Sequence, residues 1–352
     1  MAAQIGGAPV LVLPAAGIGG TERVASFLFQ EFVAINPATT LVVCMGPPDS
    51  DLAQVGRAHF LGKSSTLRAA LAIARLPEVR AGRPLLVFQT GTSVLLAALK
   101  QAGIIRSRLV VRSPTHLSSL WASKRGPAEV LFASLLRIPD LHICQSESIR
   151  SDLVSRWGVR REHVVTIPNP VTRTAISQTT EQASRPYAIV VGNLRPEKGH
   201  VRLVERLASV GFPIDLVLVG NGSEYAAIVE AATRLHVSNR IRFVHDCTDP
   251  MPLISSAAML FCASYFEGFP NAVLEAAVAG VPVIGFSDCD VLHEILEDGA
   301  GGLLVDPCDA SELSEAVERI LSGAFTPDWD PVIRRHEPSH VVRQYWNAVQ
   351  GA

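Results

Sequence analysis

Residues 259–285 read MLFCASYFEGFPNAVLEAAVAGVPVIG and contain a complete strand–helix–strand unit. The apolar run 259–262 predicts a buried strand, and the alanine-rich segment after Pro270 predicts a helix that ends near Gly280. A second apolar run follows at 282–285. Two strands joined by one helix lie parallel in one sheet, so this stretch predicts an α/β fold.

Two acids, Glu267 and Glu275, stand eight residues apart in this unit. Glu267 lies in the loop after the first strand, and Glu275 lies in the first turns of the helix. Such a loop brings a carboxylate and backbone N–H groups to the positive end of a helix dipole, where hydroxyl-rich or phosphorylated ligands bind. The alternative is an ordinary turn with two surface acids.

The same alternation of strands and helices runs through almost the whole chain. Strands are predicted at 10–13, 40–44, 84–88, 108–112, 141–145, 163–167, 187–191, 214–219, 241–244, 258–262, 282–285 and 302–305. Helices are predicted at 21–34, 65–77, 92–101, 126–137 and 147–157, between the later strands, and at 341–349. This order predicts parallel sheets covered by helices on both faces.

A chain of 352 residues exceeds one typical core, so two domains are expected. The polar stretch 171–186, which is rich in Ser and Thr and ends at Pro186, is the best linker. We therefore predict Rossmann-like, doubly wound domains at 1–170 and 187–325, facing each other across a cleft. The tail, 326–352, is expected to pack back on the first domain.

The composition, 48% hydrophobic and 18% charged, is that of a folded globular protein. The sequence shows neither a run of about 18 uncharged apolar residues nor the basic start of a signal peptide. The six cysteines have no C-x-x-C spacing, and thus no metal site is predicted. We expect a cytoplasmic protein that binds no metal.

Charge is distributed unevenly along the chain. Residues 1–170 hold 18 Lys/Arg and 10 Asp/Glu, a net +8, which leaves 13 and 23 for residues 171–352, a net −10. A basic first half favours an anionic partner, such as a lipid-linked diphosphate or the lipid headgroups at the inner face of a membrane. The basic residues are scattered and not interleaved with aromatic ones, which argues against nucleic acid. Uneven charge without a function is the alternative.

The first predicted strand ends in a glycine-rich turn, with Gly17, Gly19 and Gly20 opening a helix that could receive a phosphate. A dinucleotide fingerprint requires a third glycine where Glu22 stands, so the sequence argues against NAD. A tight turn without a ligand remains open.

Two other phosphate or metal patterns fail. The triplet Gly62-Lys-Ser64 lacks the first glycine of a P-loop, since position 57 is arginine. The D-x-D pairs at 49–51 and 288–290 match the motif of metal-dependent sugar transferases, but so short a motif is common by chance.

A second loop follows the strand 187–191 and contains Asn193, Arg195 and Lys198. Cations there could neutralise the charge on a departing diphosphate, or they could simply be solvated. The glycine at 222 is explained by loop geometry, and contact with a ligand is a second possibility.

His116 lies just past an apolar strand and could donate a hydrogen bond to a sugar hydroxyl or a phosphate, although a loop histidine without such a role is as consistent with the sequence. Thr21, at the start of a predicted helix, and Arg112, at the end of a predicted strand, are the candidate acceptor contacts.

Together these segments resemble the retaining GT-B glycosyltransferases of family 4, which include many O-antigen and capsule sugar transferases. The resemblance spans about 10–322 and rests on GGTERV at 19–24, LHICQSE at 141–147 with VTIPNPV at 165–171, VGNLRPEKG at 191–199, and E-x7-E at 267–275 followed by GGLLVD at 301–306.

The resemblance implies a role for each matching residue. Lys198 would grip the donor diphosphate, Glu267 would approach the donor sugar, and Glu275 would hold the ribose. The remaining donor contacts would be Gly19, Gly20, Asn193, Gly222, Gly268, Phe269, Pro270 and Asn271, with Arg195 assisting catalysis. His116 is a further catalytic candidate, although it does not align cleanly with the histidine of the family's first domain. The leaving phosphate would take the acceptor proton on the same face, so configuration would be retained without a metal.

The chain departs from the family pattern at Asn193, where arginine is usual, and Arg195 is the candidate substitute. We expect transfer of a hexose or N-acetylhexosamine from a UDP-sugar to a lipid-linked or other glycan acceptor, with no cofactor beyond the nucleotide sugar. The alternatives are a sugar-nucleotide-binding subunit with little activity and a UDP-sugar epimerase of the GT-B fold.

Overall fold

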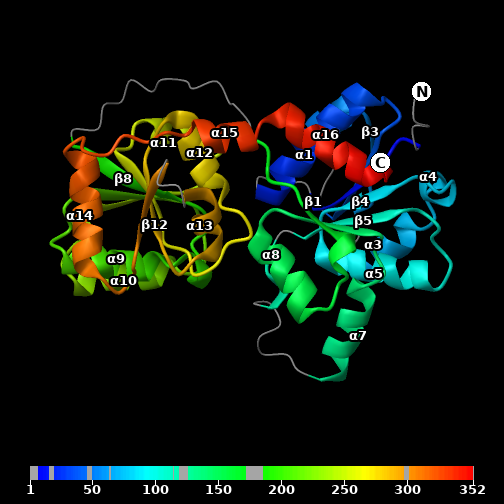
Figure 1. Ribbon diagram of the computed structural model, residues 1–352, viewed down its shortest axis with the longest axis horizontal. Coiled ribbons are helices and arrows are strands. Elements are labelled where there is room, and N and C mark those ends of the chain that lie inside the picture. Colours follow the sequence, from blue (N-terminus) through cyan, green and yellow to red (C-terminus); the bar gives the residue numbers. More distant parts are fainter. Residues whose placement is uncertain are drawn as a thin grey trace. The chain divides into compact units, whose positions relative to one another are not determined.

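The computed structural model describes residues 7–15, 20–45, 50–62, 65–113, 115–118, 126–171, 185–296 and 301–351. The chain divides into two compact units, Met1–Pro170 with Pro338–Ala352 (unit 1) and Val171–Glu337 (unit 2). Each unit is a parallel sheet with helices on both faces, as Figure 1 shows.

Unit 1 contains a seven-stranded sheet in the order β3-β2-β1-β4-β5-β6-β7, with every pair parallel. Its strands are β1 (Val10–Ala15), β2 (Thr40–Met45), β3 (Arg57–Phe60), β4 (Leu85–Val87), β5 (Leu109–Ser113), β6 (Leu141–Cys144) and β7 (Val164–Thr166). The order reverses beside β1, as in doubly wound sheets.

The helices of unit 1 cover both faces of this sheet. They are α1 (Gly20–Ile35), α2 (Ser50–Val55), α3 (Thr66–Ile73), α4 (Pro77–Arg80), α5 (Thr90–Gln101), α7 (Pro127–Leu136), α8 (Glu147–Ser151), the π-helical turn η1 (Asp152–Arg156), the 3₁₀-helix η2 (Arg161–His163) and α16 (Pro338–Gln350). Along β1, Leu11 and Leu13 pack with α1 and α16, whereas Val10 and Val12 pack with α3 and α5. Because successive side chains of a strand point to opposite faces of the sheet, β1 contributes to the hydrophobic cores on both faces.

The C-terminal helix α16 packs against α1, at the other end of the sequence (Figure 1). The Phe32 and Trp346 rings meet edge to face with centroids 5.0 Å apart. Residues 326–337, which the sequence analysis grouped with this tail, belong to unit 2. The reason is packing, because Trp329 and Val332 are buried in the unit 2 core.

Unit 2 contains a six-stranded parallel sheet in the order β10-β9-β8-β11-β12-β13. Its strands are β8 (Tyr187–Val191), β9 (Asp215–Val219), β10 (Ile241–Val244), β11 (Met259–Cys262), β12 (Val283–Phe286) and β13 (Gly302–Val305). Its helices are the 3₁₀-helix η3 (Pro196–Lys198), α9 (His200–Ser209), α10 (Tyr225–Arg234), the 3₁₀-helix η4 (Ser238–Arg240), α11 (Met251–Ser255), α12 (Asn271–Ala279), α13 (Asp290–Leu296), α14 (Ala310–Leu321) and α15 (Asp330–Arg335). The core on one face includes α11, α12, α13 and α15, and that on the other includes α9, α10 and α14.

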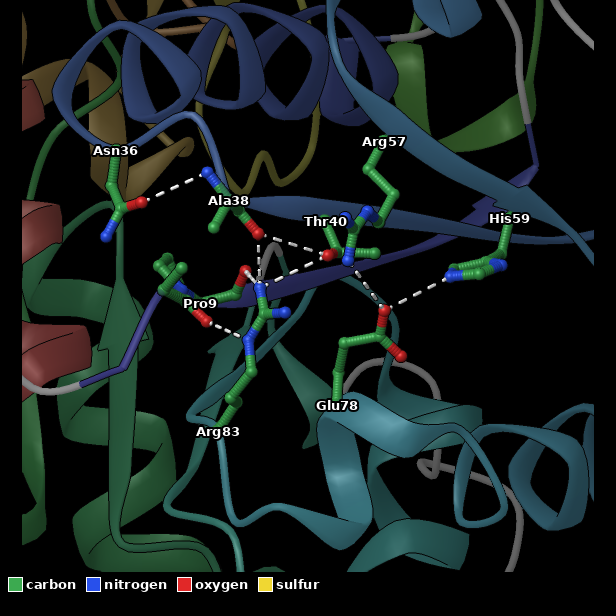
Figure 2. Close-up of polar contacts among 9 residues, drawn as sticks. Pro9, Asn36, Ala38, Thr40, Arg57, His59, Glu78 and Arg83 are labelled. Carbon is green, nitrogen blue, oxygen red and sulfur yellow. Dashed lines mark hydrogen bonds and ion pairs between the residues drawn. The ribbon is translucent and has the colours of Figure 1, made fainter.

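Arg83 joins the amino ends of three unit 1 strands (Figure 2). Its guanidinium donates to the carbonyl oxygens of Ala8 at 2.5 Å and Ala38 at 2.6 Å, and to the Thr40 hydroxyl at 3.1 Å. Arg83 precedes β4, Ala8 precedes β1 and Thr40 begins β2. One side chain therefore satisfies carbonyl groups at the edge opposite the strand carboxyl ends.

Candidate active site

Two of the predicted donor residues lie at the point where the strand order of unit 2 reverses. The chain leaves β8 toward β9 on one side of the sheet and leaves β11 toward β12 on the other. In open α/β sheets, ligands bind outside the strand carboxyl ends at such a reversal. Lys198 follows β8 and Glu267 follows β11. The topology therefore places these side chains where a ligand is favoured.

Lys198 and Glu267 form an ion pair there. Lys198 Nζ lies 2.5 Å from Glu267 Oε1, and the Ser264 hydroxyl donates to the same oxygen at 2.6 Å. The Glu267 side chain is 11% exposed and the Lys198 side chain 27%. The pair is thus largely enclosed but open to a ligand from solvent.

Backbone contacts hold the loops that carry this pair. Lys198 ends η3 and is followed by Gly199, which has a left-handed φ of 65°. A Cβ atom at Gly199 would lie 2.1 Å from the Ala263 carbonyl oxygen, so this close approach requires glycine. The Tyr265 N–H also donates to the Glu197 carbonyl at 2.9 Å. The two loops therefore pack as one body.

The loop after Glu267 leads directly into α12. Gly268 and Pro270 are buried, and Phe269 is partly buried with its ring centroid 5.2 Å from that of His336. The Phe269 ring thus packs near His336 within unit 2, and the backbone continues into α12.

Helix α12 begins directly after this loop, so the positive end of its dipole lies beside Glu267. Pro270 at its N-cap makes no side-chain hydrogen bond to the first turn, and the Val273 N–H donates to the Pro270 carbonyl at 2.9 Å. Asn271 is the first helical residue, and Glu275 lies one turn later on the same face. Both are partly buried.

Two other residues predicted to contact the donor phosphate are more exposed than Lys198. Asn193 is exposed, and Arg195 is 60% exposed with its Nη1 3.9 Å from a Glu197 carboxylate oxygen. Gly222 is glycine for a packing reason, because a Cβ atom there would lie 2.1 Å from the Leu194 carbonyl oxygen. Their donor contacts stay predictions.

In unit 1, Gly19 lies outside the described residues, and Gly20 and Thr21 begin α1. His116 is partly buried, with its Nε2 3.1 Å from the Ser148 hydroxyl. This contact holds the imidazole near the start of α8.

Arg112, a predicted acceptor contact, lies in the interior of unit 1 and is 2% exposed. Its Nε donates to the Tyr345 hydroxyl at 3.2 Å and its Nη2 to Asn169 Oδ1 at 2.8 Å. These bonds connect β5 with α16. Arg112 therefore has a packing role here, and contact with an acceptor would require the side chain to leave these partners.

Sequence reasoning missed Ser264, which donates to Glu267, and Arg202, which donates to the Ala263 carbonyl in the same loop. The signal for Ser264 was its position two residues after the strand and three residues before Glu267. Arg202 lies one turn after Lys198 in α9, and its partners are distant in sequence, so no local pattern marks it.

Burial controls the protonation of two neighbouring side chains. Burial, followed by the nearby Lys198 charge, lowers the pKa of His200 to about 4. Burial, followed by the Glu267 charge, raises the pKa of Cys262 to about 12. Both groups are neutral near pH 7, so neither adds a charge beside the Lys198–Glu267 pair.

Within the described ranges, no three or more His, Cys, Asp or Glu side chains are arranged to hold a metal ion. No helix in the same ranges is long and apolar enough to cross a membrane.

Two family descriptions match successive parts of the chain. Residues 18–174 match "Glycosyltransferase Family 4", and residues 172–328 match "Glycosyl transferases group 1". The chain belongs to the GT-B glycosyltransferases of family 4. The predictions of a family 4 glycosyltransferase and of the GT-B fold are therefore confirmed.

Relatives of this family 4 chain include lipopolysaccharide enzymes. It is 28% identical over 193 residues to the lipopolysaccharide core biosynthesis glycosyltransferase LpsE of Rhizobium meliloti, covering 54% of this chain and 56% of that protein. It is 26% identical over 200 residues to the lipopolysaccharide 1,6-galactosyltransferase of Salmonella typhimurium, covering 54% and 55%. The chain thus spans about half the length of these curated relatives.

Solved structures match along the whole chain. HepE of Anabaena in complex with UDP and glucose superposes with a TM-score of 0.80 and 17% identity over 98% of this chain and 99% of that chain. WaaG, a glycosyltransferase involved in lipopolysaccharide biosynthesis, superposes with a TM-score of 0.71 and 14% identity over 98% of this chain and 100% of that chain. At these identities the likeness shows the fold.

Proposed function

We propose that the protein is a retaining, metal-independent glycosyltransferase that moves a hexose or N-acetylhexosamine from a UDP-sugar to a lipid-linked or other glycan acceptor. The observation that carries the proposal is the Lys198–Glu267 pair at the β8/β11 reversal, beside the N-terminus of α12. A cation, a carboxylate and the positive end of a helix dipole suit a diphosphate attached to a sugar.

Each group has a distinct task in this proposal. Lys198 and the N–H groups of α12 stabilise the negative charge that develops on the leaving diphosphate, which is the largest electrostatic change in the reaction. Glu267 orients the donor sugar through its hydroxyls. Glu275 accepts hydrogen bonds from the ribose. The departing phosphate oxygen removes the proton of the acceptor hydroxyl on the same face, so no separate protein base is needed.

The choice of donor and acceptor is supported by related proteins. HepE has been crystallised with UDP and with UDP-glucose, and LpsE is named for lipopolysaccharide core biosynthesis. A UDP-sugar donor and a glycan acceptor are the corresponding proposals for this chain.

The position of Asn193 favours a second candidate, a sugar-nucleotide-binding subunit with little activity. Arg195, the candidate substitute for the missing arginine, has its guanidinium beside Glu197, so its charge is partly offset. Tight UDP binding without turnover in the presence of acceptor would select this candidate. An epimerase would instead convert the donor sugar without any acceptor.

The test has two stages. A thermal-shift screen against UDP, GDP, dTDP and ADP identifies the base, and we expect UDP to raise the melting temperature most. Purified protein is then incubated with UDP-glucose, UDP-galactose and their N-acetyl forms, with and without a glycan acceptor, and released UDP is measured. Absence of both transfer and hydrolysis with every nucleotide sugar contradicts the proposal.

We also propose that unit 1 binds the anionic inner face of a membrane. Its first 170 residues carry a net +8, and helix α7 exposes Val130 (67%) and Leu131 (62%) side by side. Co-sedimentation should be strong with vesicles containing phosphatidylglycerol and weak with neutral ones, and weaker for the double variant Val130→Ser, Leu131→Ser. Equal binding to both vesicle types contradicts the proposal.

A further inference from the structure

Arg202 has an unusually complete set of contacts for a side chain outside the predicted site. Its Nε donates to the Ala263 carbonyl at 2.8 Å. Its Nη1 and Nη2 donate to the Asp288 carboxylate at 2.5 and 3.1 Å. Its guanidinium lies 3.7 Å from the centroid of the Tyr265 ring and 4.9 Å from that of Phe286. The Arg202 side chain is 12% exposed.

These contacts join three loops at the same edge of the sheet. Arg202 belongs to α9, directly after the loop of Lys198. Ala263 and Tyr265 belong to the loop of Glu267, and Asp288 follows β12. The guanidinium therefore bonds to the backbone four residues before Glu267 and lies over the ring two residues before it.

Asp288 gains a function from this arrangement. In the sequence it opens a D-x-D pair, the pattern of a metal-binding sugar transferase, yet in the structure its carboxylate accepts two hydrogen bonds from Arg202. A bidentate pair of this kind fixes the plane of the guanidinium. That plane in turn lies against the Tyr265 ring, which is 49% exposed.

We propose that Arg202, held by Asp288, is a positioning residue that fixes the Glu267 loop relative to Lys198. Its kinetic consequence rests on the proposed function, since Glu267 and Lys198 must meet the sugar and the diphosphate of one donor. Lysine cannot replace it, because an ammonium has neither the planar fork nor the flat face for Tyr265.

A matched control is present in the same unit. Arg240 also pairs with a carboxylate, that of Asp215, and lies 5.7 Å from the centroid of the Phe212 ring. This pair is at the amino ends of β9 and β10, the opposite edge of the sheet. Loss of Arg240 therefore reports what removing a stacked ion pair costs in stability alone.

The experiment compares Arg202→Met, Arg202→Lys and Arg240→Met with the wild type. Hydrogen exchange of the Tyr265 amide, which donates to Glu197, should become at least about tenfold faster in both Arg202 variants and stay unchanged in Arg240→Met. Because kcat depends on how Glu267 meets the sugar, it should fall about 10- to 100-fold in the Arg202 variants. Uridine binding should stay within about twofold of the wild type, since the ribose site on α12 is not attached to Arg202.

Unchanged exchange at Tyr265 in a folded Arg202→Met protein overturns the proposal, as does faster exchange with wild-type kcat. If Arg202→Met does not fold, Asp288→Asn decides by the same two measurements, with expected changes of about three- to tenfold. A wild type that binds no nucleotide and has no turnover contradicts the proposed function instead, and the exchange measurement still decides the positioning role.

Discussion

Lys198 and Glu267 share a single contact, Nζ to Oε1 at 2.5 Å, although they are 69 residues apart in the chain. Each follows a different strand at the β8/β11 reversal, so the pair exists only because the sheet topology brings the two loops together. In this arrangement the cation and the carboxylate offset each other. Under the proposed function, a diphosphate that enters the site would draw Lys198 toward itself, which would free Glu267 to accept hydrogen bonds from sugar hydroxyls.

Replacing Glu267 should therefore affect turnover more than nucleotide binding. In Glu267→Gln the sugar loses a charged acceptor, while Lys198 is released from its partner and can still bind the diphosphate. We expect kcat to fall about 100-fold or more, with the Kd for UDP within about threefold of the wild type. Glu205→Gln, in an exposed pair with Arg234, is the control. A parallel loss of UDP affinity would show that Glu267 binds the nucleotide instead.

Lys198→Met should have the reverse effect. A charge-assisted contact to the diphosphate is worth about 1.5–3 kcal/mol, so the Kd for UDP should rise about 10- to 150-fold by calorimetry. Lys100→Met removes a lysine of unit 1 that is paired with Asp140, and it should leave UDP binding unchanged. Wild-type UDP affinity in Lys198→Met would remove the phosphate role from this residue.

Glu275→Ala tests the ribose contact separately from the phosphate contact. Uridine has no phosphate, so its binding should weaken about tenfold or more in Glu275→Ala and remain unchanged in Lys198→Met. The two variants together thus map the two halves of the nucleotide. Equal uridine affinity in Glu275→Ala and the wild type would exclude the ribose assignment.

The sequence predicted the fold well where strands are buried on both faces. Runs such as 259–262 are continuously apolar because helices cover both sides of the sheet, and the structure confirms strands at these places. Strand β3 was missed because its sequence, Arg57-Ala-His-Phe60, is short and half polar. It lies at the edge of the sheet, where only one neighbour and partial burial are required.

The sequence located the Glu267 loop and Lys198 but not what holds them. The glycines at 199 and 222 read as ordinary turn residues, yet each is required by a carbonyl oxygen from a distant loop. Arg112 was a candidate acceptor contact in the sequence and is buried against Tyr345, because α16 returns to unit 1 from the end of the chain. Contacts between segments far apart in sequence leave no local pattern.

Arg83→Met should destabilise unit 1 without affecting the site. The variant removes the guanidinium donor from the Ala8 carbonyl and leaves the Ala38 carbonyl (Figure 2) with only the 3.3 Å bond from the Thr40 hydroxyl, and we expect the free energy of unfolding to fall by about 2–4 kcal/mol. Arg57→Met is the control. The Arg57 side chain is 62% exposed, and its ion pair with the Glu78 carboxylate is long, at 3.7 Å. Its loss should therefore cost less than about 1 kcal/mol. Urea unfolding followed by circular dichroism measures both. Equal losses in the two variants would contradict a special role for Arg83.

Unit 1 should lose stability as the pH falls from 6.5 to about 4, because of His142. Burial lowers the pKa of this histidine from 6.5 to about 4, while its Nε2 lies 2.9 Å from the Leu136 carbonyl. The unfolded chain therefore binds more protons in this interval, so the stabilisation is complete above pH 6.5 and is lost as the pH falls to about 4. The loss from this one group should approach about 3 kcal/mol.

His142→Gln keeps a hydrogen-bonding side chain but cannot titrate, so its unit 1 transition should depend less on pH in this interval. In a Trp329→Phe background all remaining tryptophans belong to unit 1, and their fluorescence in urea reports its unfolding separately from unit 2, where the buried His200 titrates in the same direction. If the free energy of unfolding of unit 1 falls equally with pH in His142→Gln and its parent, another group titrates and the assignment to His142 is wrong.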